Sequence, residues 1–346
     1  MAYRLDDKMV IGISSRALFD MSVENEIFEK QGVEAYCKYQ VEHENEILKP
    51  GPGFALVKAL LRLNECCGDR DLVEVIIMSR NSPDTSLRVF NAIDYYGLHI
   101  TRAALASGAS LAPYLEAFQT DLFLSAYEDD VQCAVDSGIA AGIICTENIP
   151  AAGYSTVLEV AKRHGAICFP GAEQAPAASE EFKIGEMQQI RIAFDGDAVI
   201  FTDESEHIYQ QMGLDAFEEN ERKLASSPLK EGPFAKFLRK LSDIQKELGA
   251  DNCPIRTALV TSRSAPAHER VIRTLRAWNV RVDEAFFLGG IPKRDILKAF
   301  GAQIFFDDQS VHTLSAAQSV PAARVPYRRD KRSETKTNEI SSCCTG

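Results

Sequence analysis

Short runs of apolar, often β-branched residues alternate with helical patterns along most of the chain. In the second half, strands are predicted at 190–194, 257–261, 285–288 and 303–306. Between them, "PFAKFLRKLSDIQKEL" and "HERVIRTLRAW" carry apolar residues at helical spacing. Alternating strands and helices of this kind predict an α/β fold with a parallel sheet flanked by helices.

The two halves of the chain resemble each other. "MVIGISSRALF" aligns with "IRIAFDGDAVI", which pairs Ile11 with Ile192, and the same offset pairs Gly51 with Gly232. Further along, "IIMSRNSP" aligns with "LVTSRSAP" and "YLEAF" with "ILKAF", after small changes of offset. An ordered series of matches predicts an internal duplication that gives two related Rossmann-like lobes, at 8–146 and 189–327.

Three segments fall outside this strand–helix pattern. Residues 147–188 include "FPGAEQAPAASEEF", whose composition is typical of a linker. Residues 328–346 lack apolar periodicity and are expected to be a disordered tail. The stretch between Asp195 and Thr261 is longer than a strand–helix crossover needs, so we expect a helical cap at about 204–250 that closes over a ligand.

Charge and composition narrow the class of protein. The net charge of −12 argues against a nucleic-acid binder, although a local pocket can still attract an anion. The first residues lack a basic region followed by a long apolar one, so we expect no signal peptide, and no apolar run approaches the length of a membrane span. The nine cysteines lack the spacing of a disulfide framework or a zinc site, which is typical of reduced thiols in a cytoplasmic protein.

Polar residues follow the predicted strands of the second half, where parallel sheets bind ligands. They lie at four places along the chain: Asp195-Gly196-Asp197, Thr261-Ser262, Lys293, and Asp307-Asp308. Singly, each has a structural explanation: the hydroxyls can cap a helix, the lysine can be a solvated surface residue, and the aspartates can form a turn. Together and in this order, they resemble the four motifs of the haloacid-dehalogenase superfamily of phosphotransferases.

This arrangement suits the chemistry of phosphomonoesters. A divalent cation such as Mg²⁺ would relieve the repulsion between a phosphate dianion and an attacking carboxylate. We expect Asp195 to be the nucleophile and Asp197 to be the general acid and base. Thr261, Ser262 and Lys293 would hold the phosphoryl oxygens. The expected metal ligands are the carboxylates of Asp195, Asp307 and Asp308 and the backbone carbonyl of Asp197.

Longer blocks resemble one family within that superfamily. "SSRALF", "YQVEHENE" followed by "PGPGF", "RIAFDGDAVIFTDESE", "CPIRTALVTSRSA" and "IFFDDQ" are similar to the cytosolic 5′-nucleotidase I family, from about residue 9 to 327. The resemblance implies Mg²⁺-dependent hydrolysis of nucleoside 5′-monophosphates, chiefly AMP. It also implies ADP as an effector and a homo-oligomeric state. The alternatives are a phosphatase or phosphotransferase acting on another monoester, and a non-catalytic nucleotide-sensing protein.

The first half lacks the catalytic residue types. Ser14 aligns with Asp195, Arg16 with Asp197, Met78 with Thr261, Leu111 with Lys293, and Ser125-Ala126 with Asp307-Asp308. We therefore expect one catalytic centre per chain, in the second half. The first half is either an effector or anion site or a purely structural partner or dimer surface. The candidate residues for the anion site are Ser14, Ser15, Arg16, Ser79 and Arg80.

A few further side chains are candidates for contact with the rest of the substrate. Tyr209, Phe217 and Phe234 could stack on a base or form the core of the cap. Arg256 and Arg263 are weaker candidates, because surface or core-edge positions explain them equally well.

Overall fold

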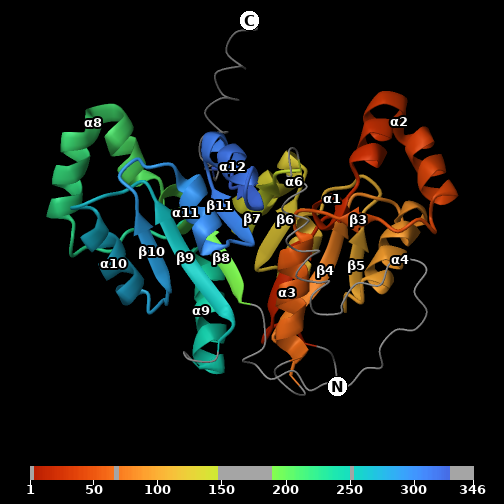
Figure 1. The fold of residues 1–346 in the computed structure, drawn as a ribbon, viewed down its shortest axis with the longest axis horizontal. Coiled ribbons are helices and arrows are strands. Elements are labelled where there is room, and N and C mark those ends of the chain that lie inside the picture. The colour runs from red at the N-terminus through yellow and green to blue at the C-terminus, as the bar shows by residue number, and fades with distance from the viewer. Residues whose placement is uncertain (1–3, 66–69, 147–188, 250–252, 328–346) are drawn as a thin grey trace, which may run out of the picture.

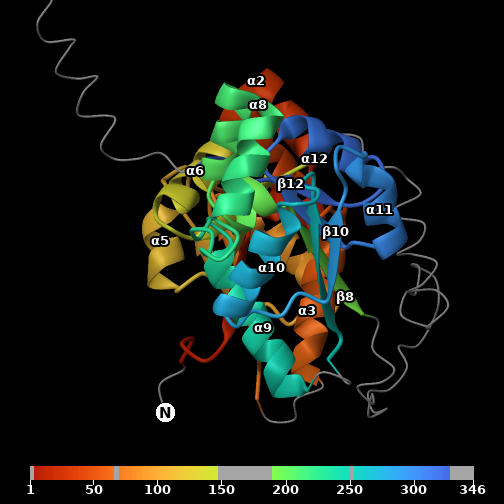
Figure 2. The ribbon, with the colours of Figure 1, turned by 90° about the vertical axis from the view of Figure 1, so that its left-hand side faces the viewer.

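The computed structural model describes residues 4–65, 70–146, 189–249 and 253–327. The predicted linker at 147–188 and the predicted disordered tail at 328–346 lie outside these residues. Within them, ten strands form one mixed sheet with helices on both sides (Figures 1 and 2). The strand order is β10-β9-β8-β11-β12-β7-β6-β1-β4-β5.

Each half of the chain contributes five parallel strands to this sheet. The first lobe holds β1 (Met9–Ile13), β4 (Val73–Ser79), β5 (Arg102–Leu105), β6 (Leu122–Ser125) and β7 (Ala140–Ile144). The second lobe holds β8 (Ile190–Phe194), β9 (Ile255–Thr261), β10 (Glu284–Phe287), β11 (Ile304–Asp307) and β12 (Ala322–Arg324). The lobes join where β7 and β12 pair antiparallel, with Ala323 opposite Ile144.

Strand order supports the predicted duplication. From one edge of the sheet to its centre, the second lobe has the order β10-β9-β8-β11-β12. From the other edge to the centre, the first lobe has the order β5-β4-β1-β6-β7, in which each strand is the counterpart of the one in the same place in the second lobe. The register corrects one detail of the sequence alignment. Ile13 pairs with Ile77, and its counterpart Phe194 pairs with Leu259. Thr261 is therefore the counterpart of Ser79, the last residue of β4, and the alignment of Met78 with Thr261 was wrong.

Three apolar clusters cover the two faces of the sheet. One is continuous across both lobes and includes α3 (Phe54–Glu65), α4 (Leu87–Tyr95), α9 (Ala235–Leu248) and α10 (His268–Ala277). On the other face, α5 (Ala112–Ala117) and α6 (Glu128–Asp136) pack on the first lobe. There, α11 (Lys293–Phe300) and α12 (Ser310–Ala317) pack on the second lobe. The alternation of side chains along buried strands accounts for these separate clusters.

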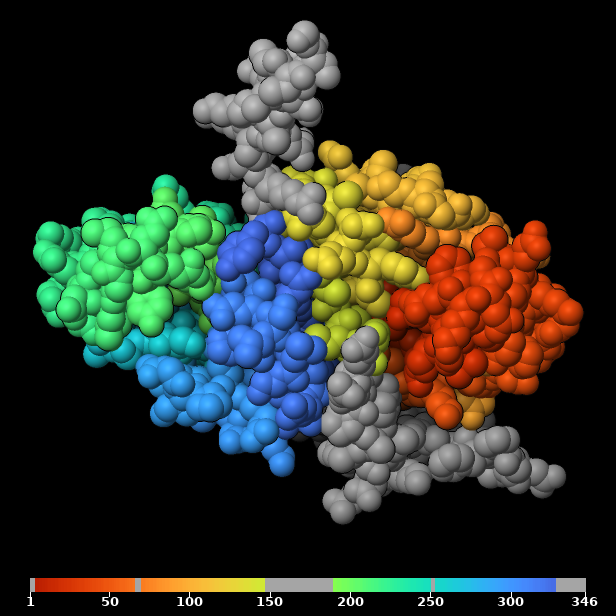
Figure 3. Space-filling view, turned by 90° about the horizontal axis from the view of Figure 1, so that it is seen from above, coloured from red at the N-terminus to blue at the C-terminus, as the bar shows by residue number. Residues whose placement is uncertain are grey.

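Two long helices project from opposite ends of the molecule (Figures 1 and 3). They are α2 (Ser22–Glu42) and α8 (Glu204–Lys223), and each breaks at a glycine with positive φ, Gly32 at 84° and Gly213 at 83°. Glycine adopts this conformation without steric cost. The expected cap range of 204–250 thus covers α8, which projects, and α9, which packs on the sheet.

Short elements connect these parts. In the first lobe, α1 (Ser15–Leu18) leads into β2 (Phe19–Asp20), which pairs with β3 (Lys49–Pro50), and η1 (Asp84–Ser86) precedes α4. In the second lobe, the turn η3 (Gly196–Ile200) follows β8. Among the helices that the structure describes, none has the length and hydrophobicity needed to cross a membrane.

Candidate active site

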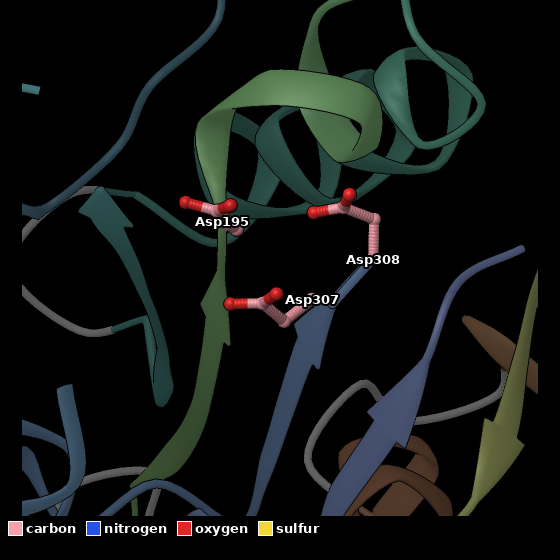
Figure 4. A group of neighbouring side chains, drawn as sticks. All are labelled: Asp195, Asp307 and Asp308. Carbon is pink, nitrogen blue, oxygen red and sulfur yellow. The ribbon is translucent and has the colours of Figure 1, made fainter. Parts of the chain in front are cut away.

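Three carboxyl groups meet at one edge of the second lobe (Figure 4). Asp195 follows β8, Asp307 ends β11, and Asp308 is the next residue. Each offers an oxygen that lies within 4.8 Å of the others, and all three residues are buried. Because β8 and β11 are adjacent and parallel, their carboxyl ends bring these residues together.

Lys293 is the cation of this cluster. It is buried, and its Nζ lies 2.8 Å from Asp195 Oδ1 and 2.6 Å from Asp307 Oδ2. Burial alone would lower the pKa of Lys293, but the two aspartates outweigh burial and raise it. Lys293 is therefore a charged residue of the site, and the alternative of a solvated surface lysine was wrong.

The cluster has three carboxyl groups and one lysine beside them, so its acidic groups outnumber its cation. Burial raises the pKa of Asp195 to about 6 and that of Asp308 to about 7, and it also raises the pKa of Asp307. The Oδ1 atom of Asp308 is buried and has no hydrogen-bond partner within the described residues. Hard oxygen ligands with unbalanced negative charge fit a divalent cation such as Mg²⁺.

The carboxylate of Asp197 is held by hydrogen bonds from Arg263. Arg263 donates to both of its carboxylate oxygens, from Nε to Oδ2 at 2.7 Å and from Nη2 to Oδ1 at 2.6 Å. The third branch of Arg263, Nη1, donates to Glu221 Oε2 at 2.6 Å. Glu221 is fully buried near the end of α8 and also accepts from Arg270 at 2.8 Å. A buried ion network therefore joins Asp197 to the projecting helix.

The hydroxyl residues after β9 differ in their surroundings. Thr261 is buried, and its Oγ1 accepts a hydrogen bond from the backbone N–H of Arg263 at 3.3 Å. It also lies against the turn after Asp195, since a side chain at Gly196 would come within 3.3 Å of Oγ1. Ser262 is exposed. Thr261 is thus packed against the turn that follows Asp195, whereas Ser262 faces solvent.

The candidates for base contact fall into different environments. Phe234 is fully buried and packs against Phe194 and Phe306, so it belongs to the core. Phe217 lies 5.4 Å from the Arg263 guanidinium and stacks edge-on with the exposed Tyr209. These two remain candidates on the projecting helix.

Arg256 lies near the start of β9, at the end of the strand away from the carboxylates, and pairs with Glu284 at 3.3 Å. It is therefore not near the site.

Several residues at the site had no signal in the sequence. Glu206, near the start of α8, accepts from Gln309 at 2.9 Å, which brings the projecting helix to the residue after Asp308. Burial raises the pKa of Glu206. Tyr327 donates from its hydroxyl to Asp308 Oδ2 at 2.6 Å. Glu221 lies in the charged run "EENERK", which reads as a solvated helix face.

The candidate anion site of the first lobe, at the equivalent strand ends, carries several hydroxyl groups. Ser15 donates to Ser79 at 3.1 Å, and Ser14 accepts from the N–H of Ala17 at 3.3 Å. Arg80 is held by the buried Asp130, with Nη2 2.7 Å from Oδ1 and Nε 3.0 Å from both oxygens. Arg16 lies over the ring of Tyr127, 5.3 Å from its centroid. Of the two arginines proposed for an anion site, Arg80 is therefore already neutralised.

Comparison with known proteins identifies the class to which this fold and site belong. The 5′-nucleotidase family model matches residues 1–183 and 168–332, and the chain belongs to that family. The two matched segments correspond broadly to the two lobes. A similar protein is human cytosolic 5′-nucleotidase 1B, which is 38% identical over 314 residues. The aligned region covers 88% of this chain and 46% of that relative, so the chain spans about half of its length.

Proposed function

We propose that this protein hydrolyses nucleoside 5′-monophosphates, with AMP favoured, to a nucleoside and phosphate. The observation that carries the proposal is the buried cluster of Asp195, Asp307 and Asp308 around Lys293 in a chain of the 5′-nucleotidase family. A nucleotide-sensing protein would need no buried nucleophile beside a lysine. The same cluster would serve another phosphomonoester, so a sugar phosphatase is the second candidate.

Mg²⁺ would take its ligands from Asp195, Asp307, Asp308 and the backbone carbonyl of Asp197, and when bound it would neutralise the phosphate and activate its phosphorus. Asp195 attacks phosphorus, and the P–O bond to the nucleoside breaks to give an aspartyl-phosphate. Lys293 and Thr261 hold phosphoryl oxygens. Water then attacks the aspartyl-phosphate, which releases phosphate and regenerates Asp195.

Asp197 gives a proton to the leaving nucleoside oxygen and later takes one from the attacking water. Both of its oxygens accept from Arg263 in the present arrangement. Proton transfer therefore requires Asp197 to release at least one of these hydrogen bonds when substrate is bound. Catalytic hydrogen bonds commonly rearrange between the free and bound forms of an enzyme.

The wider setting of the protein is also part of the proposal. The human relative is named as a cytosolic enzyme, and we extend a cytoplasmic location to this chain. The resemblance on which the proposal rests also implies ADP as an effector and a homo-oligomer. The first-lobe anion site of Ser14, Ser15 and Arg16 is the candidate effector site, with Arg16 as its cation.

Phosphate release from a substrate panel tests the proposal. We expect the full chain with Mg²⁺ to release phosphate from AMP faster than from CMP, IMP, dTMP or glucose 6-phosphate, and EDTA to abolish release. Asp195→Asn should lower the rate by about 10³-fold or more, since it removes the nucleophile. Faster release from the sugar phosphate would favour the second candidate. Tight AMP binding without phosphate release would favour a sensing protein.

A further inference from the structure

Tyr327 joins the candidate metal cluster to the lobe that lacks catalytic residues. It follows β12, at the junction of the two lobes. Its hydroxyl donates to Asp308 Oδ2 at 2.6 Å, while its backbone carbonyl accepts from Gln132 Nε2 at 2.8 Å. Gln132 is buried on α6 of the first lobe. Tyr327 thus contacts the carboxylate of Asp308 through its hydroxyl and the opposite lobe through its backbone carbonyl.

A second contact fixes the same segment. Arg324, at the end of β12, donates from Nη2 to Glu128 Oε1 at 2.6 Å, and Glu128 begins α6. Figures 1 and 3 show α6 and α12 side by side at the centre of the molecule. The segment 324–327 is therefore held by α6 at both of its ends.

The hydroxyl of Tyr327 restricts how the carboxyl group of Asp308 can turn. The Tyr327 hydroxyl donates to Oδ2 of Asp308, and Oδ1 of Asp308 is buried without a hydrogen-bond partner among the described residues. One oxygen of Asp308 is turned toward Asp195 (Figure 4). Hydrogen bonds from outside a metal site commonly fix the orientation of a ligand, and losing one typically costs 10- to 100-fold in metal affinity.

We propose that Tyr327 is a positioning residue that orients Asp308 toward the cation, and that the first lobe holds Tyr327 in place through Gln132. This inference rests on the proposed function, because it assumes a cation between Asp195, Asp307 and Asp308. It gives the first lobe a role in the site of the second. That role needs no ligand at the candidate anion site of the first lobe.

Direct Mn²⁺ binding to the full chain, measured by the EPR signal of the free ion without substrate, tests this inference. We expect Tyr327→Phe to raise the Mn²⁺ dissociation constant by about 10-fold or more. The Mg²⁺ concentration for half-maximal phosphate release should rise in parallel, with kcat at saturating Mg²⁺ and KM for AMP near the wild-type values. Tyr114→Phe, an exposed tyrosine on α5, is the matched control and should bind Mn²⁺ as the wild type does.

Gln132→Met tests the contribution of the first lobe, because it keeps the length of the side chain and removes the donor to Tyr327. We expect Mn²⁺ affinity to weaken, by less than in Tyr327→Phe. Wild-type Mn²⁺ affinity in Tyr327→Phe would overturn the positioning role, and wild-type affinity in Gln132→Met alone would overturn the role of the first lobe. If Asp308→Asn also binds Mn²⁺ normally, the proposed metal site itself is wrong.

Discussion

Arg263 holds Asp197 through two parallel hydrogen bonds, Nε to Oδ2 at 2.7 Å and Nη2 to Oδ1 at 2.6 Å. Such a bidentate pair fixes both the position and the plane of the carboxylate. Because Nη1 of the same guanidinium donates to Glu221 on α8, the placement of Asp197 depends on the projecting helix. The first lobe has the uncharged Asn81 and Gln40 where the second has Arg263 and Glu221, so the second lobe alone has charged side chains at both positions.

Glu221→Gln should weaken both the fold and the reaction. Glu221 is the fully buried partner of Arg263 and Arg270, and the change leaves two buried guanidinium groups without its charge. We expect the free energy of unfolding to fall by about 3 kcal/mol. We also expect a lower kcat, because Asp197 loses part of its support. Urea unfolding and phosphate release from AMP measure the two effects.

The control for this substitution is Glu219→Gln on the same helix. Glu219 is exposed and pairs with Lys223 at 2.8 Å, one turn along the helix. Loss of an exposed pair of this kind should cost about 0.5 kcal/mol or less and leave kcat unchanged. Equal effects of the two substitutions would argue against a special role for the buried network.

In the metal-free protein, the stability that Asp308 contributes should be lost as the pH rises from about 4 to about 7. Burial raises the pKa of Asp308 to about 7, against 3.8 for the unfolded residue, so the folded chain holds a proton that the unfolded chain has lost in that range. For Asp308, this difference corresponds to a contribution on the order of 4 kcal/mol. In EDTA, Asp308→Asn should therefore become more stable relative to the wild type between pH 4.5 and 7.5. A stability difference that does not change with pH would contradict the assignment.

Mg²⁺ should reverse this trend, since it binds the ionised carboxylates. The rise in melting temperature on adding Mg²⁺ should therefore be larger at pH 7.5 than at pH 5.5. Asp308→Asn should reduce that rise at both pH values.

Several residues of the candidate site could be predicted from the sequence because they lie at the ends of predicted strands or at the start of a helix. Asp195, Asp307 and Lys293 stand at strand ends or a helix start, and a parallel sheet brings such positions to one edge. Glu221 and Tyr327 could not be found this way. Glu221 is buried only because α8 folds against Arg263 and Arg270, and Tyr327 depends on the contact between two lobes.

The wrong alignment of Met78 with Thr261 between the two halves of the chain has a physical explanation. The letters "SR" at 79–80 match those at 262–263, but strand pairing fixes the register independently of residue identity. The structure instead aligns two hydroxyl residues in the same role. Ser79 Oγ accepts from the N–H of Asn81 at 3.1 Å, as Thr261 Oγ1 accepts from that of Arg263 at 3.3 Å.

Gly232→Ala should displace the turn that carries Asp197. A Cβ at Gly232 would lie 2.3 Å from the carbonyl oxygen of Phe201 and 2.6 Å from that of Val199. Both contacts are with backbone, which cannot move aside without shifting η3, so we expect a loss of about 3 kcal/mol and a lower kcat. Gly213→Ala is the control, because a Cβ at Gly213 would have no atom within 4 Å. The positive φ of Gly213 is then the sole source of strain. It should cost about 1 kcal/mol, and a larger loss there than at Gly232 would contradict the steric argument.

Arg16→Ala separates the effector hypothesis from a purely structural role of the first lobe. Arg80→Ala is a poor test, because it would leave the buried carboxylate of Asp130 unpaired and cost about 3 kcal/mol. Arg16 is only partly buried and stacks on Tyr127, so its removal should cost about 1 kcal/mol or less. If ADP binds at the candidate anion site of the first lobe, Arg16→Ala should lose activation by ADP while keeping its basal rate of phosphate release from AMP. Arg273→Ala, an exposed arginine on α10, should keep both. Undiminished activation in a stably folded Arg16→Ala protein would overturn the effector role of this site.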